Sequence, residues 1–217
     1  MRKALALGIL GLAIGGWSGA DLSAGEYGLN SPMVEQDIPH GPWDEEGFEF
    51  TFITGPFFGP AFGVEGGRET LDYFSNSFRL GLNLTGIIGD SWYRGCFQFV
   101  GEIFVAEIFK SGGDGGGSIV VGPNALFRYN FVQENWPVVP YIQLGPGLVY
   151  TDTKNNAIGS AFGFQLNIGV GLRFMINDKW AVSGEFDWHH MSNAGFAEHN
   201  AGSNEAGGQL GISYFFF

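Results

Sequence analysis

The stretch "FQLNIGVGLRF", residues 164–174, decides the fold, because apolar residues occupy every second position in it. The apolar set is Phe164, Leu166, Ile168, Val170, Leu172 and Phe174, and the set between them is Gln165, Asn167, Gly169, Gly171 and Arg173. A period of two places successive side chains on opposite faces of a β-sheet. A soluble sandwich also alternates, but its outer face is usually richly charged, whereas this polar set is small, glycine-rich and carries an isolated arginine. The pattern therefore predicts a strand of a small transmembrane barrel, with its apolar side chains facing lipid.

The same alternation of apolar and polar residues recurs along the chain. It occurs in segments of ~9–11 residues or slightly more, the length of a tilted membrane strand. We expect strands at Phe48–Gly55, Asp72–Gly86, Cys96–Lys110, Ser118–Phe131, Val138–Thr151, Gly163–Ile176, Trp180–Asn193 and Glu205–Phe217. Short connections (residues 89–95, 133–137 and 177–179) alternate with longer ones (residues 55–70, 110–118, 151–163 and 192–204). Periplasmic turns and longer outward loops are typical of outer-membrane barrels. We therefore predict an all-β fold, an eight-stranded antiparallel transmembrane β-barrel in the outer membrane of a Gram-negative-type cell.

The N-terminal stretch "MRKALALGILGLAIGGWSGA", residues 1–20, has the pattern of a secretory signal peptide. Arg2 and Lys3 form a positive region, an apolar run follows, and small residues offer a cleavage site. A membrane anchor is the alternative, but the apolar run is short for a spanning helix. We expect cleavage of residues 1–20, an acidic polar leader over 21–46, which we interpret as solvated, and the barrel over 47–217.

Composition limits the classes of function that fit the chain. It has 37 glycines, 22 phenylalanines and only 15% charged residues. Removal of Arg2 and Lys3 leaves 8 basic against 22 acidic residues, a net charge near −14, and this argues against a nucleic-acid partner. The single cysteine, Cys96, is interpreted as a small filler. The chain shows no convincing metal-ligand spacing, and we expect neither a metal nor another cofactor.

An eight-stranded barrel encloses just enough room for side chains, so a porin-like channel is not expected. Strand parity turns several charged residues into this interior, namely Arg79, Arg128, Arg173, Glu102, Glu185 and Asp187. Because an unpaired charge there would be costly, we predict that they pair in a buried polar network.

Near the C-terminus the chain reads "WHHMSNAGF", residues 188–196. Parity along this strand turns His189 inward and both His190 and Ser192 outward, about 6–7 Å apart along the strand. Polar groups on a lipid-facing surface find few partners, so this pair could form the working part of an enzyme. The other interpretation, which parity alone favours slightly, is an interfacial histidine and a loop serine within reach of headgroups and water. Parity alone leaves both interpretations open.

The segment "HMSNAG", His190–Gly195, resembles the H-x-S-N-A-G signature of the lipid A 3-O-deacylases, the PagL family of the outer membrane. The following "HNAGSN", residues 199–204, is similar to that family's Asn-x-Gly turn before the last strand. The motif match covers about 30 residues, and the rest of the chain agrees in architecture. The resemblance implies hydrolysis of the acyl ester at the 3-position of lipid A, with Ser192 as nucleophile and His190 as general base. Backbone N–H groups near Asn193 and Gly195 become candidates for the oxyanion hole.

The chain departs from the family pattern at the third catalytic position, a glutamate in the family. Asn204 stands there, with Glu205 next to it, and parity along the last strand turns Asn204 outward and Glu205 inward. Three outcomes follow: Asn204 orients His190, Glu205 does so through a β-bulge, or the site is weak. Glu198, in the loop, is a fourth candidate. In serine proteases the change from carboxylate to amide costs about 10⁴ in kcat.

The sequence therefore predicts an outer-membrane esterase of the lipid A deacylase type, with lipopolysaccharide as substrate, outer-membrane lipid as surroundings and a possible homodimer. Two alternatives stay open: a non-catalytic barrel with a structural or adhesive role, and a different lipid esterase such as a phospholipase.

Overall fold

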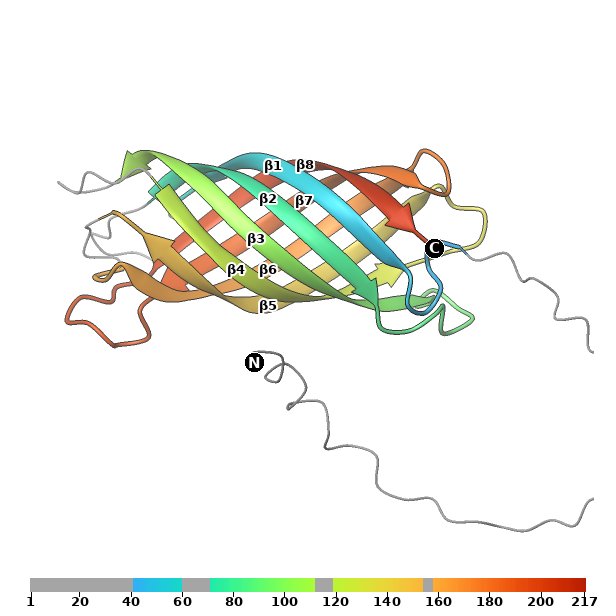
Figure 1. Ribbon diagram of the computed structural model, residues 1–217, viewed down its shortest axis with the longest axis horizontal. Coiled ribbons are helices and arrows are strands. Elements are labelled where there is room, and N and C mark those ends of the chain that lie inside the picture. Colours follow the sequence, from blue (N-terminus) through green and yellow to red (C-terminus); the bar gives the residue numbers. More distant parts are fainter. Residues whose placement is uncertain (1–40, 60–70, 112–118, 154–157) are drawn as a thin grey trace, which may run out of the picture. The chain divides into compact units, whose positions relative to one another are not determined.

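The computed structural model describes residues 41–59, 71–111, 119–153 and 158–217. The strands are β1 (Phe48–Phe58), β2 (Leu71–Asn83), β3 (Gly95–Ser111), β4 (Ile119–Phe131), β5 (Val138–Thr151), β6 (Phe162–Met175), β7 (Trp180–Ser192) and β8 (Ser203–Phe216). Each pairs antiparallel with the next, and β8 pairs with β1, so the sheet closes into a barrel (Figure 1). The predicted eight-stranded barrel is confirmed. The predicted signal peptide, residues 1–20, and the leader up to residue 40 lie outside the described residues.

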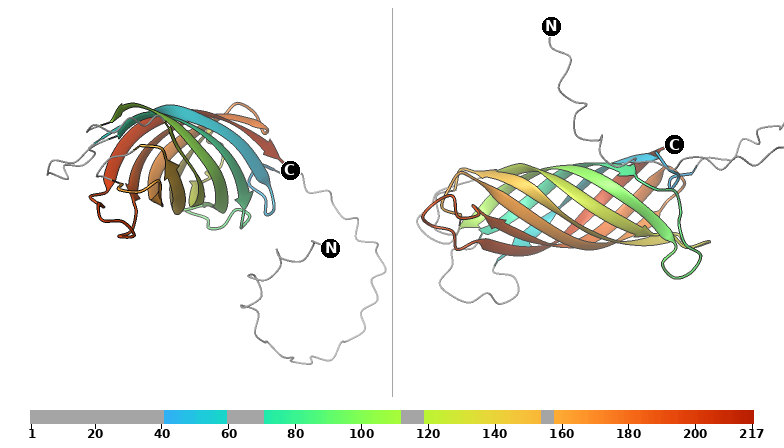
Figure 2. Two further views of the ribbon diagram at one scale, coloured as in Figure 1. Left: turned by 60° about the vertical axis from the view of Figure 1, so that its left-hand side comes forward. Right: turned by 90° about the horizontal axis from the view of Figure 1, so that it is seen from below.

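The connections after β4 and β6 are short, as predicted, but the connection after β2, residues 84–94, is as long as the β7–β8 connection, residues 193–202. The turns after β2, β4 and β6 lie at one end with the C-terminus, and the described β7–β8 connection lies at the other (Figures 1 and 2). No segment in the described ranges forms a helix of the length and hydropathy that a membrane crossing needs.

Alternation along each strand matches the burial of its side chains. In β6, for example, Gln165, Asn167 and Arg173 are buried, while Phe164 and Leu166 are exposed on the outer face. The predicted strand bounds hold to within three residues. The largest differences are that β1 continues to Phe58 instead of ending at Gly55, and that β2 ends at Asn83 instead of Gly86.

The extension of β1 has a physical reason in the barrel interior. Phe57 is fully buried there and stacks on His189, with ring centroids 4.2 Å apart, and on Tyr73 at 5.0 Å. His189 in turn hydrogen-bonds the Tyr73 hydroxyl through Nδ1 at 2.7 Å. These contacts stabilise the continuation of β1 beyond the glycine and proline at positions 55 and 56.

The interior is layered, with an apolar cluster at each end and a polar layer between them. The cluster at the loop end contains Phe57, Leu71, Tyr73, Phe104, Ala106, Ile108, Val120, Val149, Ile158 and Met191. The cluster at the turn end contains Trp43, Cys96, Val132, Val139, Ala181 and Phe215. Cys96 is buried, as a filler should be.

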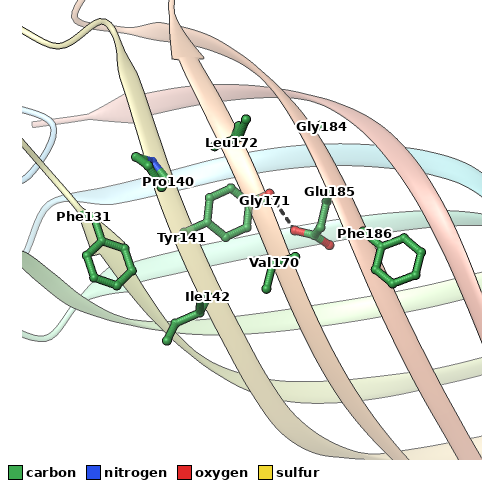
Figure 3. A pocket seen from close by; sticks show the side chains of 10 residues that line it. All are labelled: Phe131, Pro140, Tyr141, Ile142, Val170, Gly171, Leu172, Gly184, Glu185 and Phe186. Carbon is green, nitrogen blue, oxygen red and sulfur yellow. Dashed lines mark hydrogen bonds between the residues drawn. The ribbon is translucent and has the colours of Figure 1, made fainter.

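The polar layer pairs the charges that parity turned inward. Arg79 forms ion pairs with Glu102 and, at 2.8 Å, with Glu185, as predicted. Glu185 also accepts a 2.7 Å hydrogen bond from the Tyr141 hydroxyl (Figure 3). Asp187 joins the network through side-chain amides rather than through an arginine, accepting from Gln209 at 2.9 Å.

The other two arginines share a carboxylate that our sequence analysis did not single out. Oε1 of Glu49 lies 2.9 Å from Nη1 of Arg128 and 2.8 Å from Nη2 of Arg173. All three side chains are fully buried. Glu49 is therefore the common counter-ion of two guanidinium groups from β4 and β6.

The residues just before β1 close the turn end of the barrel. Asn83 donates from Nδ2 to the carbonyl oxygens of Pro42 (3.1 Å) and Asp44 (2.8 Å), fixing a short turn. This turn inserts Trp43, which is only 8% exposed, against the ring of Phe215 at 5.4 Å. The Arg173 guanidinium lies 5.5 Å from the Trp43 ring centroid. The last part of the expected solvated leader thus supplies a buried plug.

Replacement of Trp43 by alanine is expected to lower the free energy of unfolding by about 3 kcal/mol, because it opens a cavity against Phe215 and Arg173. Urea titration of the lipid-refolded barrel, followed by gel mobility of unheated samples, measures the change. Trp92→Ala is the matched control, since Trp92 is 77% exposed in the turn after β2, and it should change the free energy by less than about 0.5 kcal/mol. Equal effects of the two variants would contradict the plug.

Candidate active site

Strands β7 and β8 carry the predicted site residues, and their register decides which of them meet. The ladder runs without a shift from Trp180 opposite Tyr214 to Met191 opposite Ser203, and it places His190 opposite Asn204. His190, Ser192 and Asn204 are part-exposed on the outer face.

A hydrogen bond joins Nδ1 of His190 to Oδ1 of Asn204 at 2.9 Å. A carboxamide oxygen can only accept, so Nδ1 carries the proton and Nε2 keeps its lone pair as a potential base. Glu205 is fully buried on the inner face and hydrogen-bonds the Ser203 hydroxyl. The unbroken register leaves no bulge to turn Glu205 outward, so the structure brings Asn204, and not Glu205, to the imidazole.

Gly202, which our sequence analysis did not list as a site residue, packs against this imidazole. Its φ is +74°, and a Cβ atom built there would lie 2.9 Å from Cε1 of His190. Any larger residue would be strained in its backbone and would push the ring aside. The Asn-x-Gly turn in "HNAGSN" was the available signal, because this glycine ends it.

The loop after Ser192 is organised by the buried side chain of Asn193. Its Nδ2 donates to the carbonyl oxygens of Ile158 (2.6 Å) and His199 (2.8 Å). Its Oδ1 accepts the backbone N–H of Gly195 at 2.8 Å. One amide therefore ties the β7–β8 loop to the segment before β6 and fixes the backbone that follows the serine.

The two backbone donors expected at the oxyanion hole are both used inside the loop. The N–H of Asn193 donates to Oδ1 of Asn200 at 2.8 Å, and that of Gly195 donates to the Asn193 side chain. Asn200 is a further residue that sequence reasoning missed. Between them, Ala194 has a φ of +52°, and its N–H has no acceptor within the part of the chain that the structure describes.

An apolar groove opens on the outer face beside this loop. Its volume is about 530 Å³, within the usual range for ligand sites, and residues of β4, β5 and β6 line it together with Phe196 of the β7–β8 loop. Phe164, on its wall, is the register partner of Ser192, and the rings of Phe164 and Phe196 lie 5.9 Å apart. The groove therefore begins next to the serine.

The height of Ser192 along the barrel follows from strand geometry. Trp180, at the other end of β7, packs against Tyr214 with ring centroids 4.8 Å apart and marks an interfacial aromatic belt. A rise of ~3.3 Å per residue and a tilt of ~35–45° put Ser192 about 30 Å above Trp180 along the barrel axis. The apolar band of an outer-membrane barrel is ~25 Å tall, so a height of about 30 Å corresponds to the level of the outer headgroups.

No group of three or more His, Cys, Asp or Glu side chains in the described ranges is arranged to hold a metal ion. The expectation of a cofactor-free site stays a prediction, as does the possible homodimer.

Comparison with known proteins bears on the fold and the family of the chain. The family model described as lipid A 3-O-deacylase (PagL) matches residues 72–213, about two thirds of the chain. A direct sequence comparison with curated proteins found no match. The crystal structure of the outer membrane enzyme PagL aligns with a TM-score of 0.50 at 19% identity, covering 76% of this chain and 97% of that chain. Neisserial surface protein A aligns with a TM-score of 0.52 at 14% identity, covering 79% and 100%. These structures share the barrel fold, and the family match shows that the chain belongs to the lipid A 3-O-deacylase (PagL) family of the outer membrane.

Proposed function

We propose that this protein hydrolyses the ester-linked acyl chain at the 3-position of lipid A, using Ser192, His190 and Asn204. The observation that carries the proposal is the His190–Asn204 hydrogen bond on the outer face, two residues from a serine on the same face of β7. A nucleophilic hydroxyl is activated by an imidazole that a third group orients. Side chains two residues apart on one strand face lie ~6–7 Å apart along the strand, so the imidazole can lean toward the hydroxyl.

The chemistry follows from the tautomer that Asn204 imposes. Nε2 of His190 takes the proton from Ser192 Oγ as the oxygen attacks the ester carbonyl carbon. When the tetrahedral intermediate collapses, the imidazolium returns this proton to the 3-hydroxyl oxygen of the leaving sugar, and an acyl-serine remains. The same nitrogen then deprotonates a water molecule, whose oxygen attacks the acyl carbon. The bond between this carbon and Ser192 Oγ breaks, the fatty acid leaves, and the imidazolium returns the proton to Oγ.

We further propose that the Ala194 N–H stabilises the oxyanion. It follows the serine by two residues, and the bonds of Asn193 fix the loop around it. A fixed donor aimed at developing negative charge is worth several kcal/mol in an acyl transfer. In this scheme the N–H groups of Asn193 and Gly195 hold the loop, and the oxyanion donor lies between them.

The position of the site on the barrel suits a lipid substrate. Ser192 lies near the headgroup boundary, so an ester of a lipid in the outer leaflet can reach it laterally without entering the barrel. The apolar groove beside Phe164 offers a surface for the acyl chain that is cleaved. The site lies on the outer face, at the depth of the headgroups and beside an apolar groove. These three features favour a membrane lipid over a soluble ester as the substrate.

The direct test is incubation of the purified protein, in detergent, with lipopolysaccharide and separately with phospholipid, and identification of the products by mass spectrometry. We expect release of a 3-hydroxy fatty acid from lipopolysaccharide alone. Fatty acid from phospholipid instead would favour the phospholipase alternative, and no release from either would favour a non-catalytic barrel.

A further inference from the structure

Trp188 lies directly beside the proposed catalytic imidazole. It is two residues before His190 on the same outer face of β7, and it is half-buried. The indole and imidazole rings are stacked, with centroids 5.9 Å apart and an angle of 19° between their planes. The imidazole is therefore held by Asn204 at Nδ1, by Gly202 at Cε1 and by Trp188 across its face.

Asn204 leaves one requirement of the reaction unmet. Transfer of the serine proton makes His190 a cation, and a carboxylate partner would stabilise that cation. A carboxamide oxygen carries no net charge, and the register partner of His190 on its other side, in β6, is the apolar Leu166. Neither neighbouring strand places a charge opposite the imidazole.

We infer that the π face of Trp188 stabilises the imidazolium form of His190 and takes over part of the role that a carboxylate would have. The inference rests on the proposed function of Ser192 and His190. An indole face attracts a cation within about 6 Å of its centroid, and the interaction strengthens where water is excluded, as at the edge of a bilayer. Trp188 is thus a positioning residue for the general base.

A different role for Trp188 is that of an aromatic belt residue, which anchors the barrel at the interface. The two roles differ in what a substitution changes. An anchor affects folding and membrane insertion whatever residue stands at position 204. If Trp188 stabilises the imidazolium, its substitution lowers kcat rather than raising KM, and the size of this effect depends on whether a carboxylate stands at position 204.

The experiment is a double-mutant cycle on lipopolysaccharide deacylation with the wild type, Trp188→Leu, Asn204→Glu and the variant with both changes. We expect Trp188→Leu to lower kcat by about 3- to 30-fold with little change in KM. Trp188→Phe should recover most of this loss, because it keeps an aromatic face. In the Asn204→Glu background the same leucine substitution should cost less than about 3-fold. Trp180→Leu, on the same face but at the far end of β7, is the matched control and should leave kcat unchanged.

A second readout separates this inference from the choice of substrate. Labelling of Ser192 by a fluorophosphonate probe requires the same proton transfer but no lipid A. The labelling rates of the variants should therefore change in the same way as their kcat values. If labelling follows the pattern without lipopolysaccharide cleavage, the proposed substrate is wrong and the role of Trp188 stands. An equal loss from Trp188→Leu in both backgrounds, or no recovery by phenylalanine, would overturn the inference.

Discussion

Replacement of Ser192 by alanine should abolish acyl release, with kcat lowered by about 10³-fold or more. The reason is that the hydroxyl is the proposed nucleophile, and no acyl-serine can form without it. Fatty acid release from lipopolysaccharide, quantified by mass spectrometry, measures the loss. Because Ser192 is the last residue of β7 and part-exposed, the variant should still fold, which its heat-modifiable gel mobility will show.

Ser203→Ala is the matched control for this variant. Ser203 stands in the neighbouring strand at nearly the same height, but its side chain is buried inside the barrel and hydrogen-bonds Glu205. We expect its release rate to stay within about 3-fold of the wild type, since the loss of one buried hydrogen bond costs stability rather than chemistry. Full activity of Ser192→Ala, or equal losses in both variants, would refute the proposed mechanism.

The second large effect concerns the buried carboxylate of Glu49. Glu49→Leu removes the counter-ion of both Arg128 and Arg173 and leaves two guanidinium charges unpaired in the interior. Breaking a buried pair by removing one partner typically costs about 3–5 kcal/mol. We expect a loss of at least this size in the free energy of unfolding, measured by urea titration of the refolded barrel.

Two variants calibrate this result. Glu49→Gln keeps the shape of the side chain and an acceptor oxygen. Its free energy of unfolding should therefore fall by less than that of Glu49→Leu. Glu134→Leu removes an exposed carboxylate that pairs with Arg94 at 3.6 Å in a turn, and it should change the free energy by less than about 1 kcal/mol. A loss from Glu49→Leu as small as that from Glu134→Leu would contradict the role of Glu49 in the polar layer.

The sequence by itself determined the strands and their faces. In a strand, backbone sterics set the period of two, so local residues alone show which side chains point together. This placed His190 and Ser192 on the lipid face, and it turned Arg79 and Glu102 inward without knowledge of their partners. It also placed Asn204 outward and Glu205 inward, although a one-residue slip or bulge would have exchanged the two.

Only the tertiary structure decided which distant groups meet. Pairing between β7 and β8 joined His190 to Asn204. Barrel closure brought Glu49 to Arg128, which is 79 positions later in the chain, and to Arg173, which is 124 positions later. The plug of Trp43 and the loop bonds of Asn193 likewise depend on non-local contacts. The physical reason is that alternation fixes direction within a strand, whereas register and closure fix position between strands, and these depend on packing of the whole interior.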